Sequence, residues 1–206
     1  MENIDKIYYI NLEHRKDRKE HIEEIIKKYL DTELSITVRY NAIYTKYDGN
    51  IGCSMSHLNI IKDCISKNYN NVIILEDDFE FIIDKNKFQD YLNCFFKNFK
   101  DYDILLLGAN IVNGENFENK TDFFKVTDSQ TASGYIINKK IFNKFKDICE
   151  ESVEGLKNNK PRSIYCIDQL WKKLQKTENV YSFPERVGKQ KESYSDICKK
   201  IVNHNV

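Results

Sequence analysis

Short apolar runs alternate along this chain with longer stretches in which apolar residues recur every three or four positions. The runs predict strands, because β-branched and aromatic residues at consecutive positions suit an extended, buried segment. They comprise residues 6–12, 36–40, 72–75, 103–109, 135–137 and 180–181. The intervening stretches predict amphipathic helices, including an aromatic stripe over 88–99 that is typical of a core-facing helix. Strands separated by helices predict a single α/β domain over residues 1–206, with a mixed sheet flanked by helices.

Several segments of this pattern are expected to be irregular. Gly108 is expected to end its strand, and the Asn-rich stretch 110–121 to run over the surface. A loop of small residues at 129–134 is expected to separate a short strand at 123–126 from the strand that begins at Tyr135. The charged stretch 151–162 predicts an exposed loop.

The most distinctive feature is the apolar strand 72–75, which runs directly into Glu76, Asp77 and Asp78. In open α/β sheets, ligands bind outside the carboxyl ends of the strands. Three adjacent carboxylates repel one another unless a cation lies among them. Period-two alternation would point Glu76 and Asp78 to the same side if the backbone stays extended. Taken alone, the three acids also fit simpler roles that need no cation, as caps of a following helix or as solvated loop residues.

Further polar residues follow other predicted elements. Arg15 and Arg18 lie at the junction between the first strand and its helix, where backbone amides and guanidinium groups can bind phosphate, or where they form a solvated helical turn. Gly52 is expected to form a turn, with Ser54 or Ser56 capping the next helix. His57 then falls in the first helical turn, where a lone histidine is usually structural or solvated.

Composition limits the classes of partner. Lys plus Arg and Asp plus Glu balance at 32 each, so no overall basic field favours nucleic acid. No window approaches a membrane span, and the amino terminus has no signal-peptide core. The six cysteines are scattered without a Cys-x-x-Cys pair, which predicts reduced, mostly buried thiols, a cytoplasmic location and no structural zinc site.

Together these segments resemble glycosyltransferase family 25, the group of lipopolysaccharide-biosynthesis transferases and collagen galactosyltransferases. The resemblance follows the order of the chain and covers nearly all of it. It is carried by Ile10-Asn11-Leu12 with Arg15, Asp17 and Arg18, by Gly52-Cys53 with Ser56-His57-Leu58, by Ile74 to Asp78, by Ala132 with Gly134 to Ile137, by Ile167-Asp168 near Trp171, and by Pro184, Gln190 and Ser195-Asp196-Ile197. One position departs from the pattern, since Asn50 stands where a Glu is expected.

The resemblance implies a GT-A type, Rossmann-like fold, a nucleotide-sugar donor (UDP-galactose or UDP-glucose), a glycan or protein acceptor and a divalent metal, Mn²⁺ or Mg²⁺. The implied metal ligands are Glu76, Asp78 and Asp196, the last either as a metal ligand or as a loop-closing contact. The implied donor-binding residues are Asn11, Leu12, Arg15, Arg18, Ala42, Ser56, His57 and Asp77. Asp78 and Asp168 are the implied catalytic residues of an inverting transfer, with Asp168 as the base or, equally, as a helix cap. The competing classes are a noncatalytic binding module of the same fold and a metal-dependent nucleotidyltransferase.

Overall fold

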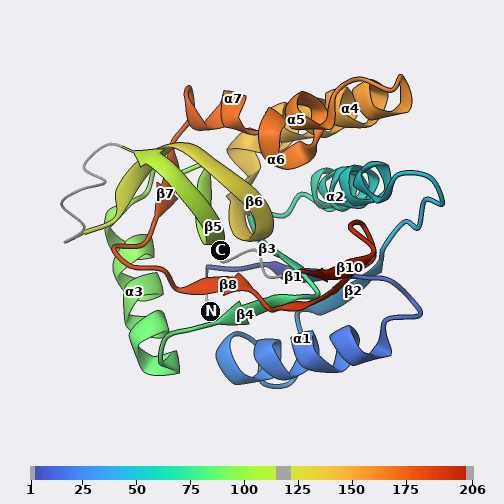
Figure 1. Cartoon of the computed structure of the whole chain (residues 1–206). Coiled ribbons are helices and arrows are strands. Elements are labelled where there is room, and N and C mark those ends of the chain that lie inside the picture. The colour runs from blue at the N-terminus through green and yellow to red at the C-terminus, as the bar shows by residue number, and fades with distance from the viewer. Residues whose placement is uncertain (1–2, 115–121, 203–206) are drawn as a thin grey trace.

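The computed structural model of the chain describes residues 3–114 and 122–202 (Figure 1). In these residues the main sheet has six strands in the order β2-β1-β3-β6-β5-β7. The strands are β1 (Lys6–Asn11), β2 (Thr37–Asn41), β3 (Asn71–Glu76), β5 (Ile104–Gly114), β6 (Phe124–Asn138) and β7 (Val180–Ser182). β1 pairs in parallel with β2 and β3, whereas β6 runs antiparallel to β3 and β5. The predicted mixed sheet is therefore confirmed.

Helices cover both faces of this sheet (Figure 1). One face carries α1 (Lys16–Tyr29) and α3 (Lys85–Asn98), and the other carries α2 (Gly49–Ser66) and α4 (Phe142–Lys157). Four short elements follow or precede α4 on that second side: η1 (Lys139–Ile141), α5 (Arg162–Tyr165), α6 (Ile167–Leu170) and α7 (Lys172–Gln175). Two small antiparallel pairs lie outside the main sheet, β4 (Phe79–Phe81) with β8 (Gly188–Gln190) and β9 (Ser193–Ser195) with β10 (Lys200–Val202).

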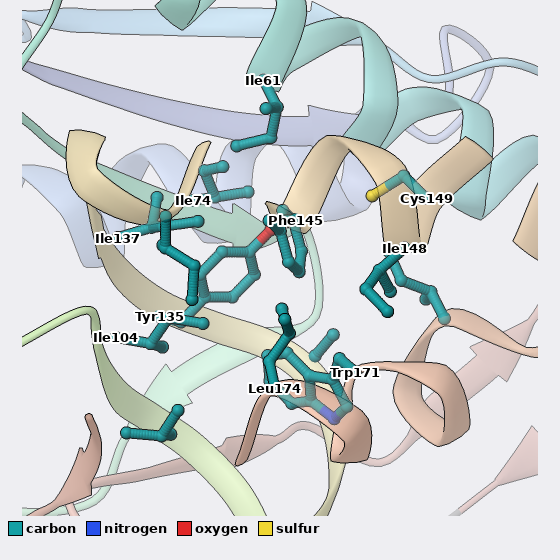
Figure 2. Packing of buried hydrophobic residues seen from close by; sticks show 14 of the residues in the cluster. Ile61, Ile74, Ile104, Tyr135, Ile137, Phe145, Ile148, Cys149, Trp171 and Leu174 are labelled. Atoms are coloured by element: carbon teal, nitrogen blue, oxygen red, sulfur yellow. The ribbon is translucent and has the colours of Figure 1, made fainter. Parts of the chain in front are cut away.

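Each face of the sheet has its own apolar core, because successive strand residues point to opposite faces. On β3, Ile74 joins the cluster under α2 and α4, while Ile73 and Leu75 join the cluster under α1 and α3. Figure 2 shows the first cluster, with the Tyr135 ring between Ile74 above and the Trp171 side chain below. The aromatic stripe of α3 lies in the second cluster, as predicted. Two-sided burial fixes the register of β3 and hence the position of the acids after it.

The second half of the chain is more regular than the sequence indicates. β5 continues past Gly108 to Gly114, and β6 is one strand across the expected loop at 129–134. The two strands stay paired through several register shifts, which accommodate the small residues that had indicated a loop. Residues 115–121 of the expected surface excursion lie outside the described residues. The stretch 151–157 is the last part of α4, because Ser152, Gly155 and Leu156 face the core.

The start of α2 also differs from the prediction. The helix begins at Gly49, and Asp48 caps it by accepting a hydrogen bond from the Asn50 amide. Gly52 lies inside the helix rather than in a turn, and a Cβ there would lie 2.1 Å from the Ile43 carbonyl oxygen. Ser56 also has no capping role, since its Oγ accepts from the Ile43 amide and donates to the Gly52 carbonyl. Gly52 and Ser56 thus hold α2 against the loop that follows β2.

All six cysteines are free thiols. Cys64 and Cys149 are buried, whereas Cys94 and Cys198 are exposed, so the expectation that most of the thiols are buried is wrong.

Candidate active site

A cavity of about 310 Å³ opens where β1 and β3 end. Both strands run in the same direction and therefore deliver their carboxyl ends to one edge of the sheet. The acids after β3 form part of its wall, together with the start of α2, the bend in β6, α6 and the carboxyl-terminal tail. The predicted residues that border it are Leu12, Arg18, Ala42, Ser56, Glu76, Asp77, Asp78, Asp168 and Asp196. Three other predicted residues lie behind this wall and contact residues in it, namely Asn11, Arg15 and His57.

Glu76 and Asp78 face the same side of the chain. The Gln190 side-chain amide of β8 donates to both, at 3.3 Å from Glu76 Oε2 and 3.4 Å from Asp78 Oδ1. β4 begins directly after Asp78 and pairs with β8, with Phe79 opposite Gln190. This small sheet therefore fixes the turn that carries the acids. The two carboxylates therefore lie close together and share one amide donor.

This proximity changes the protonation of the pair. Burial and the neighbouring Glu76 carboxylate raise the pKa of Asp78 to about 7. Burial also acts on Glu76, but the interactions with His57 and Cys53 outweigh it and lower the pKa of Glu76. At neutral pH the pair thus holds a partly protonated Asp78 beside an ionised Glu76. A cation placed between them would offset both the burial of the Asp78 charge and the repulsion from Glu76, the two causes that keep this proton bound.

Asp77 points away from this pair and is held by two side chains. The Asn11 amide donates to Asp77 Oδ2 at 2.7 Å, and Arg18 Nη1 donates to Asp77 Oδ1 at 2.8 Å. The same Arg18 nitrogen lies 3.1 Å from Asp78 Oδ2. Burial nevertheless raises the pKa of Asp77, against the charge of Arg18. Asn11 is thus a support for Asp77, while Arg18 borders the cavity and neutralises part of the acidic charge.

Glu76 is supported from α2 by two residues one helical turn apart. The Cys53 thiol donates to Glu76 Oε1 at 3.5 Å, and His57 Nε2 lies 3.6 Å from the same oxygen. The other ring nitrogen of His57, Nδ1, lies 2.7 Å from the Tyr135 hydroxyl. His57 is fully buried and hydrogen-bonded, so of the two roles expected from its sequence position it has the structural one and not the solvated one.

Asp168 borders the cavity from the first turn of α6. Its carboxylate accepts from the Thr131 amide and from the Gln169 side chain, while no side-chain cap is formed at this helix start. Burial is the main cause that raises the pKa of Asp168. Thr131 has φ of 74°, a left-handed conformation that is rare for a β-branched residue. The bend of β6 at Thr131 is therefore what brings a backbone donor to Asp168.

The carboxyl-terminal tail closes the cavity from the side of α1. Arg15 Nη1 donates to Asp196 Oδ2 at 2.6 Å and to the Tyr194 carbonyl at 2.9 Å, and His14 Nε2 lies 3.2 Å from Asp196 Oδ1. Arg15 also forms a bidentate pair with Asp17. Despite partial burial, Arg15 and His14 lower the pKa of Asp196. Both Asp196 oxygens are therefore engaged in holding the tail.

Several residues of the site were given no role from the sequence. Cys53, Thr131 and Cys166 border the cavity, and so does Gln190, which the resemblance included without a function. Cys53 and His57 are four residues apart on one helix, and this spacing, which places both on the same helix face, is the signal in the sequence that could have linked them. Asn50, at the position that departs from the family pattern, borders the cavity and donates to Asp48.

Comparison with known proteins decides the family. A model of glycosyltransferase family 25, described as LPS biosynthesis protein, matches residues 39–171. The chain belongs to glycosyltransferase family 25. The match includes Cys53, His57, the three acids and Asp168, but the residues before 39 and after 171 that carried part of the resemblance lie outside it. A comparison with curated proteins finds no match.

Several solved structures are similar to this family 25 glycosyltransferase at low sequence identity. A glycosyltransferase involved in the glycosylation of the major capsid of PBCV-1 has a TM-score of 0.51 and 10% identity, covering 78% of this chain and 74% of its own. This likeness supports the expected GT-A type of fold. Mannose-1-phosphate geranyltransferase from Thermus thermophilus scores 0.46 at 8% identity (92% and 74% covered). A cytidylyltransferase from Leptospira borgpetersenii scores 0.47 at 9% identity (90% and 77% covered).

Within residues 3–114 and 122–202, no helix of this family 25 chain combines the length and apolar character that crossing a membrane requires.

Proposed function

We propose that this glycosyltransferase, with residues 1–206 as one domain, moves galactose or glucose from a UDP-sugar to a hydroxyl group of a glycan or protein. The reaction would be metal-dependent and would invert the anomeric centre. The observation that carries this proposal is the pair Glu76 and Asp78, which share the Gln190 donor at the wall of the cavity. Two partly buried carboxylates with too little positive charge nearby are a site for a cation and for the diphosphate bound to it.

The donor set fits the expected metal. Hard divalent ions such as Mn²⁺ and Mg²⁺ prefer carboxylate oxygens, and both Glu76 and Asp78 present theirs to the cavity. When bound, the ion would stabilise the negative charge that develops on the leaving diphosphate. Asp196 takes the loop-closing role in this proposal, because Arg15 and His14 already engage its two oxygens.

The remaining donor contacts would come from the cavity wall on the β1 and β2 side. Arg18 offers a guanidinium fork, which binds phosphate oxygens in a bidentate manner. Leu12, Ala42 and Ser56 border the same space and would contact the nucleoside or the sugar. Asn11 and His57 would act indirectly, by orienting Asp77 and Glu76. Arg15 would act by holding the tail over the donor.

Asp168 would be the base. The acceptor oxygen forms a bond to the anomeric carbon, the bond from that carbon to the phosphate oxygen breaks, and UDP leaves with the electron pair. The acceptor proton passes to the Asp168 carboxylate. Burial raises the pKa of this group, which increases its affinity for a proton at the pH where transfer occurs.

The test is a panel of nucleotide sugars with and without Mn²⁺. The proposal predicts thermal stabilisation by UDP-galactose or UDP-glucose that depends on Mn²⁺, together with metal-dependent release of UDP. Release of pyrophosphate from a nucleoside triphosphate and a sugar phosphate would instead identify a nucleotidyltransferase. Failure to bind any nucleotide sugar would identify a noncatalytic binding module.

A further inference from the structure

Three side chains of different chemistry meet behind the acidic pair. Cys53 Sγ, His57 Nε2 and a Glu76 carboxylate oxygen all lie within 4.8 Å of one another. Cys53 and His57 come from one face of α2, and Glu76 comes from the end of β3. The three side chains therefore meet where the helix and the strand lie next to each other. The proposed transfer reaction uses the His57 imidazole only to orient Glu76 and gives the Cys53 thiol no chemical role.

One nitrogen of the imidazole, His57 Nε2, makes no hydrogen bond to any of the described residues. Solvent does not reach the His57 side chain either, because it is completely buried. Leaving such a group unpaired is costly, and most buried polar atoms are satisfied. The atom points toward Glu76 Oε1, 3.6 Å away, which exceeds hydrogen-bond length. A ligand that accepts the Nε2 lone pair would satisfy it.

The other nitrogen of the ring has the partner that such a ligand needs. His57 Nδ1 can donate its proton to the Tyr135 hydroxyl at 2.7 Å, which leaves the Nε2 lone pair free. Figure 2 shows the Tyr135 ring enclosed by core side chains, among them Phe145 and Trp171, whose ring centroids both lie 5.7 Å from it. The Tyr135 hydroxyl, which accepts this hydrogen bond, is therefore held in a fixed position. Histidines that bind metals are usually oriented in this way, through a hydrogen bond from the second nitrogen.

We propose that Cys53 Sγ, His57 Nε2 and Glu76 Oε1 form a binding site for a thiophilic divalent ion, Zn²⁺ in the first instance. Zinc bond lengths to sulfur, nitrogen and oxygen give tetrahedral ligand-to-ligand distances of about 3.3–3.6 Å. The observed distances to Glu76 Oε1 are 3.5 Å from Cys53 Sγ and 3.6 Å from His57 Nε2. Binding releases the thiol proton to solvent, and the thiolate with the carboxylate then balances the charge of the ion.

The fourth position of this zinc site would face the cavity, because Cys53 and Glu76 both border it. Three protein ligands with one open position are typical of zinc sites that bind a substrate atom or water. Glu76 would belong to both this site and the proposed Mn²⁺ site, so Zn²⁺ and Mn²⁺ would compete for it. The zinc site itself depends only on the three ligands and stands whether or not the chain transfers a sugar.

Cobalt(II) is the probe of the ligands, because a thiolate bound to it gives a charge-transfer absorption that oxygen ligands do not give. The full chain titrated with Co²⁺ should show this band at one equivalent, and Zn²⁺ should remove it. Cys53→Ser should abolish the band and weaken Zn²⁺ binding by about 100-fold or more. Cys166→Ser removes another thiol that borders the same cavity, and it should leave the band unchanged.

A Co²⁺ complex without the charge-transfer band would overturn the proposal, because the ion would then lie on the acids alone. Equal loss in Cys53→Ser and Cys166→Ser would overturn it as well. If Cys53→Ser does not fold, anomalous scattering at the zinc edge from crystals of the unsubstituted chain gives the answer. The expected peak lies about 2.3 Å from Cys53 Sγ, and a peak beside Asp78 without contact to Cys53 would contradict the site.

Discussion

Two groups of carboxylates border the same cavity, and they differ in how their charge is balanced. Asp196, on the tail, has an arginine and a histidine on its two oxygens, and these partners lower its pKa. Asp78, after β3, shares one arginine with Asp77 and has Glu76 beside it, and its pKa rises to about 7. The first arrangement is complete without a ligand and serves to hold the tail. The second has excess negative charge and is suited to binding a cation.

The largest effect is expected at Asp78. Asp78→Asn keeps the size of the side chain and removes its charge, so metal-dependent turnover should fall by roughly 10²–10³-fold, as when one preorganised electrostatic group is lost. The melting temperature of the metal-free protein should stay the same or rise, since the repulsion between Asp78 and Glu76 is removed. Steady-state UDP release and a thermal melt measure both. Normal turnover of a folded variant would remove Asp78 from the machinery.

Asp168 is a third carboxylate and a separate test. Like Asp78 it has a raised pKa caused mainly by burial, but its partners are the Thr131 amide and Gln169 rather than another acid. If Asp168 is the catalytic base, Asp168→Asn should lower turnover by about 10²–10⁴-fold and leave binding of the donor unchanged. Single-turnover kinetics and a binding titration separate the two quantities. Because Asn also has a side-chain oxygen that can accept from the Thr131 amide, nearly normal turnover would assign Asp168 to holding the bend of β6 rather than to catalysis.

A smaller and different effect is expected at Asp196. Asp196→Asn weakens the contact of the tail with Arg15, so KM for the donor should rise by about tenfold with little change in kcat. Stability should fall by about 1 kcal/mol, the value for a partly exposed ion pair. A matched substitution at the other end of the pair, Arg15→Gln, should give the same pattern. A fall in kcat as large as that of Asp78→Asn would make Asp196 a metal ligand.

The smallest effect is a difference in pH dependence. The folded-state pKa of Asp78 lies above its ordinary value of 3.8, so its contribution to the stability of the metal-free protein is present below that value and is lost as the pH rises through about 7. Asp196 behaves in the opposite sense, because its lowered pKa gives a contribution that is lost as the pH falls. In the presence of a chelator, the melting temperature of Asp78→Asn minus that of the unsubstituted chain should therefore increase between about pH 5 and pH 8. A gain that shrinks over this range would contradict the assignment.

The sequence predicted those elements whose apolar pattern alone defines them. β1, β2 and β3 were predicted to within about one residue of their ends, because β1 and β3 each bury most of an apolar run and β2 is rich in β-branched and aromatic residues. The apolar stripes of α1 and α3 marked those two helices. The length of β6 could not be predicted, since Ser129 to Ser133 contain no run of branched apolar residues and belong to the strand only through backbone pairing with β5 across several register shifts. The short strands of the tail have too few apolar residues to produce a pattern.

For the site, the sequence located the acids but not their division of roles. Glu76 and Asp78 share a donor that lies 112 residues beyond Asp78, and Asp77 is turned toward Asn11, 66 residues before it. Contacts at such separations follow from sheet order rather than from local spacing. Whether His57 is structural or solvated could not be predicted for a similar reason, since its partner Tyr135 lies on a strand 78 residues away. The spacing of Cys53 and His57 was visible and was not used.

Calorimetric titration of Mn²⁺, in the presence of UDP, tests the contrast between the two groups of carboxylates most directly. The account predicts one bound ion per chain in the unsubstituted protein, loss of binding in Asp78→Asn and retention of binding in Asp196→Asn. Binding that survives Asp78→Asn and is lost in Asp196→Asn would contradict it, and so would the absence of any Mn²⁺ binding by the unsubstituted chain.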